Sequence, residues 1–334
     1  MKPRWVTMSN YQELPIAKAL NAGLEKAMAA NEKVLMFGED VAELGGVFRV
    51  TEGLLAKFGE KRIFNTPIAE SGIVGTAIGL AMRGYRPVVE IQFDGFVFPA
   101  FNQITSQLAR LTYRSEGFLQ MPVVIRIPYG GGIGAVEHHS ESPEAYFAHT
   151  PGLRIVTPSN PNDAYWMMQQ AIESPDPVII LEPKRRYWQK GPVNLDTPPL
   201  PLHNARLMRE GTQVTLIAYG PMVTAALQAA EIGAEEGVSI EVIDIRSLSP
   251  IDYPTITASV RKTGRAVIVH EAPTNVSISS EIAARISNEA FYNLEAPVIR
   301  VGGFDTPYPP AKLEEIYLPD ADRILEAVDR SLAY

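Results

Sequence analysis

Glu70 combines an acidic side chain with an apolar setting. It begins a stretch in which Gly72, Gly75 and Gly79 recur at steps of three and four, the spacing of one helical face. An interior glycine destabilises a helix by about 1 kcal/mol relative to alanine, so three of them predict close contact with another backbone. A carboxylate at such a helix start either caps the helix and complements its dipole or, partly removed from water, takes part in proton transfer. The residues around it are apolar: Ile68, Ala69, Ile73 and Val74.

The histidine pair His138 and His139 is the second candidate for proton chemistry, since the chain has only five histidines. Adjacent side chains point in different directions on helical or extended backbone, so at most one of the two faces a given site. No H-x-x-H or H-E-x-x-H pattern and no cysteine accompanies them, which argues against a metal site. No G-x-S-x-G elbow supports a serine nucleophile. The pair is either an exposed loop feature or contains a proton donor.

The glycine loop at residues 130–134, just before the histidines, could bind phosphate through its backbone N–H groups. Gly130, Gly132 and Ala135 also fit a G-x-G-x-x-A dinucleotide pattern. That pattern requires a helix directly after the loop, and Pro143 follows before a helix could develop. A structural turn accounts for the glycines as well as a ligand does.

The elements that must position these residues read as alternating strands and helices. Apolar runs such as residues 34–40 and 86–96 end in charged residues, as buried parallel strands do where their carboxyl ends open on a crevice. Helical patterns cover residues 16–31, 98–114 and 162–173. The alternation predicts a parallel α/β sheet.

A proline-rich segment, GPVNLDTPPLP at residues 191–201, divides the chain, because four prolines in eleven residues cannot continue a helix or a central strand. Apolar strands and helical stretches resume beyond it. We therefore expect an α/β domain over residues 1–190, an extended linker over 191–205 and a smaller α/β domain over 206–334.

The overall composition excludes several classes of protein. The chain has 334 residues, 46% of them hydrophobic, with no apolar run of membrane-spanning length, and MKPRWVTMSN lacks the apolar centre of a signal peptide. A net charge of −8 argues against a nucleic-acid-binding surface. The absence of cysteine excludes disulfides and thiol chemistry and fits a reducing compartment. These features predict a soluble cytoplasmic enzyme.

Eight segments resemble, in order, the beta subunit of the thiamine-diphosphate-dependent first component of 2-oxo acid dehydrogenases, in particular the branched-chain type. They are GEDVAELGGVFRVTEGL, FNTPIAESGIVG, RPVVEIQFDGFVFPAFNQI, HSESPEAYFAHTPGLRIVTPS, DPVIILEPKRRY, EVIDIRSLSP, SVRKTGRAVIVHEAP and GFDTPYP. The resemblance covers the chain from about Gln12 to its end. It implies a transketolase-like α/β fold with two parallel-sheet domains, one that binds the cofactor's pyrimidine and a transketolase C-terminal domain.

The resemblance implies a role for each candidate residue. Glu70 is expected to hydrogen-bond the pyrimidine ring nitrogen of thiamine diphosphate and so favour the imino tautomer, while the cofactor itself carries the carbanion chemistry. Phe96 is expected to lie against the pyrimidine ring, where core packing is the alternative. Gln92, Glu39 and Ile68 are expected to line the same pocket.

His139 matches the active-site histidine of the family's HSQS motif, a proton donor near the reacting carbon. The motif reads HSES here, with Glu141 in place of glutamine. The family also holds a structural potassium ion through main-chain carbonyls, at positions that match Val123, Ala171 and Asp176.

The metal-binding half of the cofactor site is expected in another chain. Thiamine enzymes hold Mg²⁺ and the diphosphate at a G-D-G…N motif, and this sequence contains no GDG. The resemblance therefore implies an alpha subunit in an α2β2 assembly that works with a lipoyl acyltransferase as second component. The implied reaction is oxidative decarboxylation of a branched-chain 2-oxo acid, with pyruvate or acetoin as the alternative substrate. A nucleotide-dependent dehydrogenase and a purely structural subunit are the rival interpretations.

Overall fold

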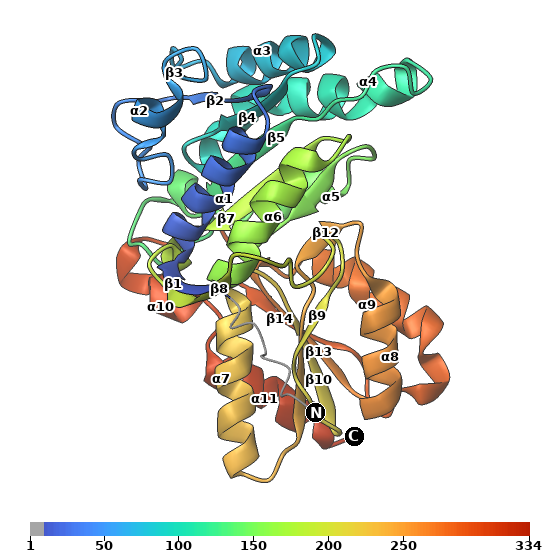
Figure 1. Ribbon diagram of the computed structural model, residues 1–334. Coiled ribbons are helices and arrows are strands. Elements are labelled where there is room, and N and C mark those ends of the chain that lie inside the picture. Colours follow the sequence, from blue (N-terminus) through green and yellow to red (C-terminus); the bar gives the residue numbers. More distant parts are fainter. Residues whose placement is uncertain (1–9) are drawn as a thin grey trace, which may run out of the picture.

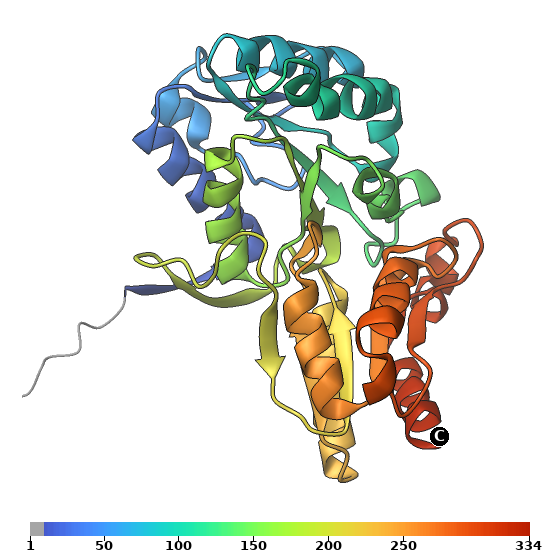
Figure 2. The ribbon, with the colours of Figure 1, turned by 90° about the vertical axis from the view of Figure 1, so that its right-hand side faces the viewer.

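The computed structural model describes residues 10–334 and shows two α/β domains, one above the other (Figures 1 and 2). Residues 1–9 lie outside the described part. The predictions that they belong to the first domain and lack a signal-peptide core therefore concern residues that are not described. The predicted α/β class is confirmed. No helix within residues 10–334 is long and apolar enough to cross a membrane.

The first domain is built on a seven-stranded sheet of order β12-β6-β7-β5-β4-β2-β3, parallel except for β12. Its strands are β2 (Val34–Gly38), β3 (Ile63–Asn65), β4 (Arg86–Glu90), β5 (Val124–Tyr129), β6 (Arg154–Val156), β7 (Val178–Pro183) and β12 (Ser247–Ser249). Alternate residues of the central strands point to opposite faces, and both faces are buried.

Helices cover both faces of this sheet. The helices α1 (Ile16–Ala30) and α6 (Pro161–Glu173) pack side by side on one face. The other helical elements of the domain are α2 (Leu54–Phe58), α3 (Glu70–Met82), η1 (Asp94–Ala100), η2 (Gln103–Leu108), α4 (Ala109–Arg114), η3 (Glu137–His139), α5 (Glu144–Ala148) and η4 (Lys184–Arg186). Buried side chains of α3 and η2 pack against the face opposite α1 and α6.

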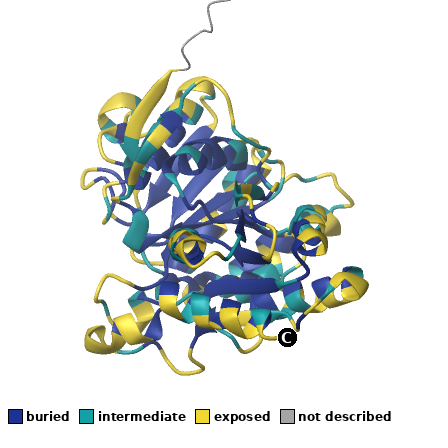
Figure 3. Ribbon diagram, turned by 90° about the horizontal axis from the view of Figure 1, so that it is seen from below, coloured by how far each residue is buried: buried dark blue, intermediate teal, exposed yellow. Residues whose placement is uncertain are grey.

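The second domain has a five-stranded sheet of order β14-β13-β10-β11-β9, in which only β9 is antiparallel. Its strands are β9 (Arg206–Arg209), β10 (Val214–Ala218), β11 (Ile240–Asp244), β13 (Ala266–Pro273) and β14 (Ile299–Gly303). Its helical elements are α7 (Met222–Glu235), α8 (Tyr253–Thr263), α9 (Ile278–Glu289), η5 (Phe291–Asn293), η6 (Ala311–Leu313), α10 (Glu314–Tyr317) and α11 (Ala321–Leu332). Figure 3 shows the strands buried at the centre and the exposed residues on the outer helices.

Two local predictions differ from the structure. Residues 98–114 are helical as expected, but the helix changes type along its length, from the 3₁₀ turn η1, which contains Pro99, through the π-helix η2 to α4. The expected linker begins with a strand, β8 (Lys190–Asn194), which pairs with β1 (Tyr11–Pro15) as a separate two-stranded sheet. A two-stranded sheet offers edge positions, where proline is tolerated.

No backbone within residues 10–334 makes the close contact expected for the α3 glycines. All three are exposed, and a methyl group added at Gly75 or Gly79 would meet nothing within 4 Å. At Gly72 it would meet only the side chain of Ala69, at 3.6 Å. The glycine face of α3 therefore lies on the surface of the chain.

We expect His270 to destabilise the chain on acidification. It is buried in β13, its Nε2 lies 2.7 Å from Ser279 Oγ, and burial lowers its pKa from 6.5 to about 4. Between these values the unfolded chain binds a proton that the folded chain does not, so stability falls as pH falls from 6.5 to 4, by about 3 kcal/mol for this group.

Urea unfolding of wild type and His270→Asn at several pH values checks this. The stability difference between the two proteins should shrink as the pH approaches 4. Parallel curves across that range would contradict it.

Candidate active site

Two buried carboxylates lie beyond the carboxyl ends of the parallel strands of the first sheet. Glu70 is the first residue of α3 and is 8% exposed, and Glu39 follows β2 directly and is 6% exposed. Burial, then the charge of Glu70, raises the pKa of Glu39. The Oε1 atom of Glu39 is buried without a hydrogen-bond partner, and Glu70 makes no hydrogen bond through its carboxylate to any residue of the range 10–334. The pair is therefore free to bind an outside group.

Gln92 ties the segment after β4 to this carboxylate pair. Its Nε2 donates to the main-chain oxygen of Glu39 and to Oδ2 of Asp40, both at 3.3 Å. Asp40 has a left-handed backbone with φ of 56°, a conformation that costs energy for a residue other than glycine and is concentrated at functional sites. The sharp turn there brings Glu39 and Gln92 together.

His139 lies among aromatic rings of the segment after β4, the one that also contains Gln92. Phe93 stacks on its imidazole with ring centroids 4.1 Å apart, and Phe96 meets it edge-on at 5.1 Å. Burial lowers the pKa of His139, and its Nδ1 is buried without a partner. His138 is exposed and contacts Glu137 at 3.4 Å. Because η1 packs against both α3 and η3, the carboxylates and His139 flank a single segment.

Ile68 lies on the surface next to Glu70, whereas the three expected potassium ligands lie away from this group. Ile68 is 84% exposed, two residues before α3. Val123 and Asp176 precede β5 and β7, at the opposite edge of the sheet, and Ala171 is in α6 near its end. The three carbonyl oxygens already accept hydrogen bonds from Val178 N, Ser174 N and Ser174 Oγ, and Arg154 pairs with the Asp176 carboxylate.

Sequence reasoning missed a buried ion pair that fixes the His139 segment. Lys184 donates from Nζ to Oδ1 of Asp94 and to the main-chain oxygen of His139. The other oxygen of Asp94 accepts from the N–H of Glu141 at 2.8 Å. Burial raises the pKa of Asp94 to about 6 and lowers that of Lys184. The only sequence signal was the position of these residues at the ends of β4 and β7.

The backbone N–H groups of the glycine loop at residues 130–134 donate to carboxylates of the protein itself rather than being available to a phosphate ligand. Gly131 N–H donates to Glu271, while the N–H groups of Gly132 and Gly134 donate to Glu314 at 2.7 and 3.0 Å. The phosphate and dinucleotide hypotheses are therefore wrong for this loop, because the required donors are already paired with anionic groups.

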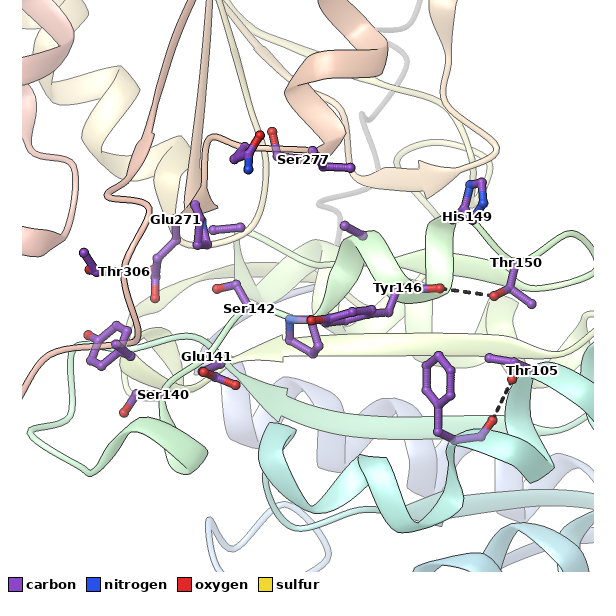
Figure 4. A pocket seen from close by; sticks show the side chains of 18 of the residues that line it. Thr105, Ser140, Glu141, Ser142, Tyr146, His149, Thr150, Glu271, Ser277 and Thr306 are labelled. Atoms are coloured by element: carbon purple, nitrogen blue, oxygen red, sulfur yellow. Dashed lines mark hydrogen bonds between the residues drawn. The ribbon is translucent and has the colours of Figure 1, made fainter.

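A pocket of about 790 Å³ opens between the two domains beside the His139 segment (Figure 4). Ser140 and Glu141 line it from the first domain, and Glu271 and Thr306 from the second. Of the residues singled out from the sequence, Glu141 lines this pocket, while Glu39, Glu70 and His139 do not. Burial, then the charge of Glu137, raises the pKa of Glu141.

No cluster of three or more histidine, aspartate or glutamate side chains within residues 10–334 could hold a metal ion. The arrangement has instead a carboxylate pair, an aromatic segment and one half-buried imidazole. It is suited to binding an organic ring and moving protons beside it.

Comparisons with known proteins identify the families of both domains. The family model described as "Transketolase, pyrimidine binding domain" matches residues 12–189, and "Transketolase, C-terminal domain" matches residues 203–324. The fold is also similar to a solved structure titled "Split gene transketolase, inactive beta4 tetramer", with a TM-score of 0.78 over 96% of this chain and 98% of that one, at 24% identity. The predicted transketolase-like fold is confirmed.

Two relatives match over nearly the whole chain. The pyruvate dehydrogenase E1 component subunit beta of Leifsonia xyli is 67% identical over 323 residues, 97% of this chain and 96% of the relative. The 3-methyl-2-oxobutanoate dehydrogenase subunit beta of Mycobacterium tuberculosis is 54% identical over 322 residues, 96% of this chain and 92% of the relative. The chain therefore belongs to the family of beta subunits of the first component of 2-oxo acid dehydrogenases.

Proposed function

We propose that this chain supplies the pyrimidine-binding half of a thiamine diphosphate site and, with an alpha subunit in an α2β2 assembly, decarboxylates a 2-oxo acid oxidatively. The acyl group then passes to a lipoyl group on an acyltransferase component. The observation that carries the proposal is the pair Glu39–Glu70, buried beside Gln92 and without donors for Glu39 Oε1.

The residues fit the cofactor chemically. Glu70 would accept a hydrogen bond from the pyrimidine ring, while Glu39 and Gln92 offer polar atoms at the same edge of the sheet. Phe96 is half-buried and offers a ring face beside His139. The bound cofactor supplies the electron sink for decarboxylation. The chain's own work is to hold the ring, keep one carboxylate beside it and deliver a proton from His139.

An alpha subunit explains the open face of α3. Three glycines and Ile68, 84% exposed, lie at or beside the helix that begins with Glu70. A helix with glycines on one face allows the backbone of another helix to pack close against it. An alpha subunit packed there would complete the site next to Glu70. The alpha subunit would also hold Mg²⁺ and the diphosphate.

We expect the isolated chain to bind Mg-thiamine diphosphate weakly, and an added alpha subunit to tighten binding at least about 100-fold, since the diphosphate is neutralised only when the metal site is present. Titration calorimetry with and without the alpha subunit measures both values. Equal affinities would contradict the half-site.

The preferred 2-oxo acid has two candidates. The segments DPVIILEPKRRY and GFDTPYP favour a branched-chain substrate, and the 54% identical relative bears such a name. The 67% identical relative favours pyruvate. Carbon dioxide release by the assembled enzyme from pyruvate, acetoin and branched-chain 2-oxo acids decides between them. Absence of turnover with every 2-oxo acid would overturn the proposed function.

The potassium site at Val123, Ala171 and Asp176 stays a prediction, since a carbonyl oxygen that accepts one hydrogen bond keeps a second lone pair for a cation. The cytoplasmic location also stays a prediction.

A further inference from the structure

The glycine loop joins the second domain to the His139 segment. Glu314, the first residue of α10, binds two of its amides at once, through Oε1 to Gly132 and through Oε2 to Gly134. Two parallel hydrogen bonds accepted by one carboxylate fix its orientation as well as its distance, and hydrogen bonds to a charged group are the stronger kind. The contact spans about 180 residues of sequence.

Glu314 is itself held in place. It is 8% exposed, and Tyr308 donates from its hydroxyl to Oε1 at 2.7 Å. A methyl group added at Gly131 would lie 1.7 Å from that hydroxyl oxygen, so the loop backbone rests directly on the second domain. The carboxylate, the tyrosine and the glycine form one close-packed unit.

The His139 segment runs between two anchors. Glu314 holds its beginning at residues 132–134, and the Lys184–Asp94 pair holds its end at residues 139–141. Between them, the internal bonds of the turn join His139 N to Val136 O and Ser140 N to Glu137 O. Without Glu314 the beginning of the segment keeps the bonds of Gly131 to Glu271 and of Gly132 to Tyr308, but it loses the paired bonds that orient Gly132 and Gly134.

The end anchor belongs to the first domain, and the beginning is held by the second. We propose that Glu314 is a positioning residue, through which the second domain holds His139 in its place beside Phe93 and Phe96. This rests on the proposed function only for the consequence in catalysis, because the order of the loop is measurable without any reaction.

The test compares Glu314→Ala, Glu314→Gln and the matched control Glu315→Ala. Glu315 is the exposed neighbour in the same short helix, so its variant removes the same charge without touching the loop. Glutamine keeps one acceptor oxygen but places its NH₂ group against the second amide, so it should restore part of the order. Glu314→Gln also keeps the shape of the side chain, which preserves the test if the alanine variant does not fold.

Amide hydrogen exchange of the full chain is the first measurement. We expect residues 131–141 to exchange at least about tenfold faster in Glu314→Ala, with an intermediate rate in Glu314→Gln and no change in Glu315→Ala. Unchanged exchange in both Glu314 variants would overturn the proposal.

The second measurement is acyl transfer to a lipoyl domain by each variant assembled with the alpha subunit. We expect Glu314→Ala to lower transfer about tenfold while cofactor affinity is retained, and Glu314→Gln to recover part of it. Faster exchange with unchanged transfer would overturn the positioning role. If His139→Ala itself left transfer unchanged, the role proposed for His139 would fail, and the exchange rates would still decide whether Glu314 holds the loop.

Discussion

Replacement of Glu70 by alanine is expected to lower turnover of the assembled enzyme at least about 100-fold without unfolding the chain. General acid–base effects are typically 10²–10⁴-fold, and Glu70 is the buried carboxylate at the start of the open helix α3. Its loss should not weaken the fold, because it forms no hydrogen bond or ion pair with residues 10–334 and an unpaired buried charge is costly to keep.

Steady-state turnover and thermal unfolding measured on the same preparation check this expectation. Glu60→Ala is the matched control, since Glu60 is an exposed acid of the same domain. Turnover of Glu70→Ala above about a tenth of wild type would remove Glu70 from the mechanism. A large fall in melting temperature would instead assign it a structural role.

Replacement of His139 by alanine should lower acyl transfer to lipoyl groups at least about tenfold more than it lowers decarboxylation with an artificial electron acceptor. Opening of the lipoyl disulfide leaves a sulfur that needs a proton, and an imidazole can deliver and recover one near neutral pH. Carbon dioxide release draws mainly on the cofactor as electron sink. The two rates measured on one variant separate these steps.

The pH dependence of the transfer step provides a second measurement. Since burial lowers the pKa of His139, the proton-bearing imidazole is the minor form at neutral pH, and its fraction rises as the pH falls. Transfer by wild type should therefore rise as the pH falls toward that pKa, and His139→Ala should lose this rise.

His138→Ala is the matched control, and it should be milder in both assays because His138 is exposed. Equal losses of both rates in His139→Ala would assign that histidine to an earlier step. A larger effect at His138 would mean that the other ring is the donor.

Local patterns in the sequence predicted the fold class and most strands, since their periods reflect which faces are buried. They also placed Glu70 at a helix start, which the structure confirms. The glycine spacing was interpreted correctly as a helical face, and the backbone expected to contact that face is not found within residues 10–334. A sequence pattern shows that a face needs a neighbour and does not show which molecule supplies it.

Contacts between distant residues could not be predicted in this way. Glu314 and Glu271 bind the glycine loop from the other domain, so the loop looked like a phosphate site. Lys184 and Asp94 are 90 residues apart. They meet because Lys184 follows β7 and Asp94 follows β4, and the carboxyl ends of these two parallel strands lie on the same side of the sheet. Pairing of this kind is set by the topology, and a single sequence carries no local sign of it.

The first sheet is complete only after β12 has been synthesised, because this strand comes from the part of the chain beyond the prolines. It comes from residues 247–249, beyond the prolines, and forms the edge of the first sheet by pairing with β6. On the ribosome, β6 therefore remains an unpaired edge while the intervening residues are made, at roughly 5–20 residues per second. An unpaired edge invites pairing with another chain. A protein cut at the proline segment would keep β6 as an exposed edge strand permanently, whereas in the full chain β12 covers it.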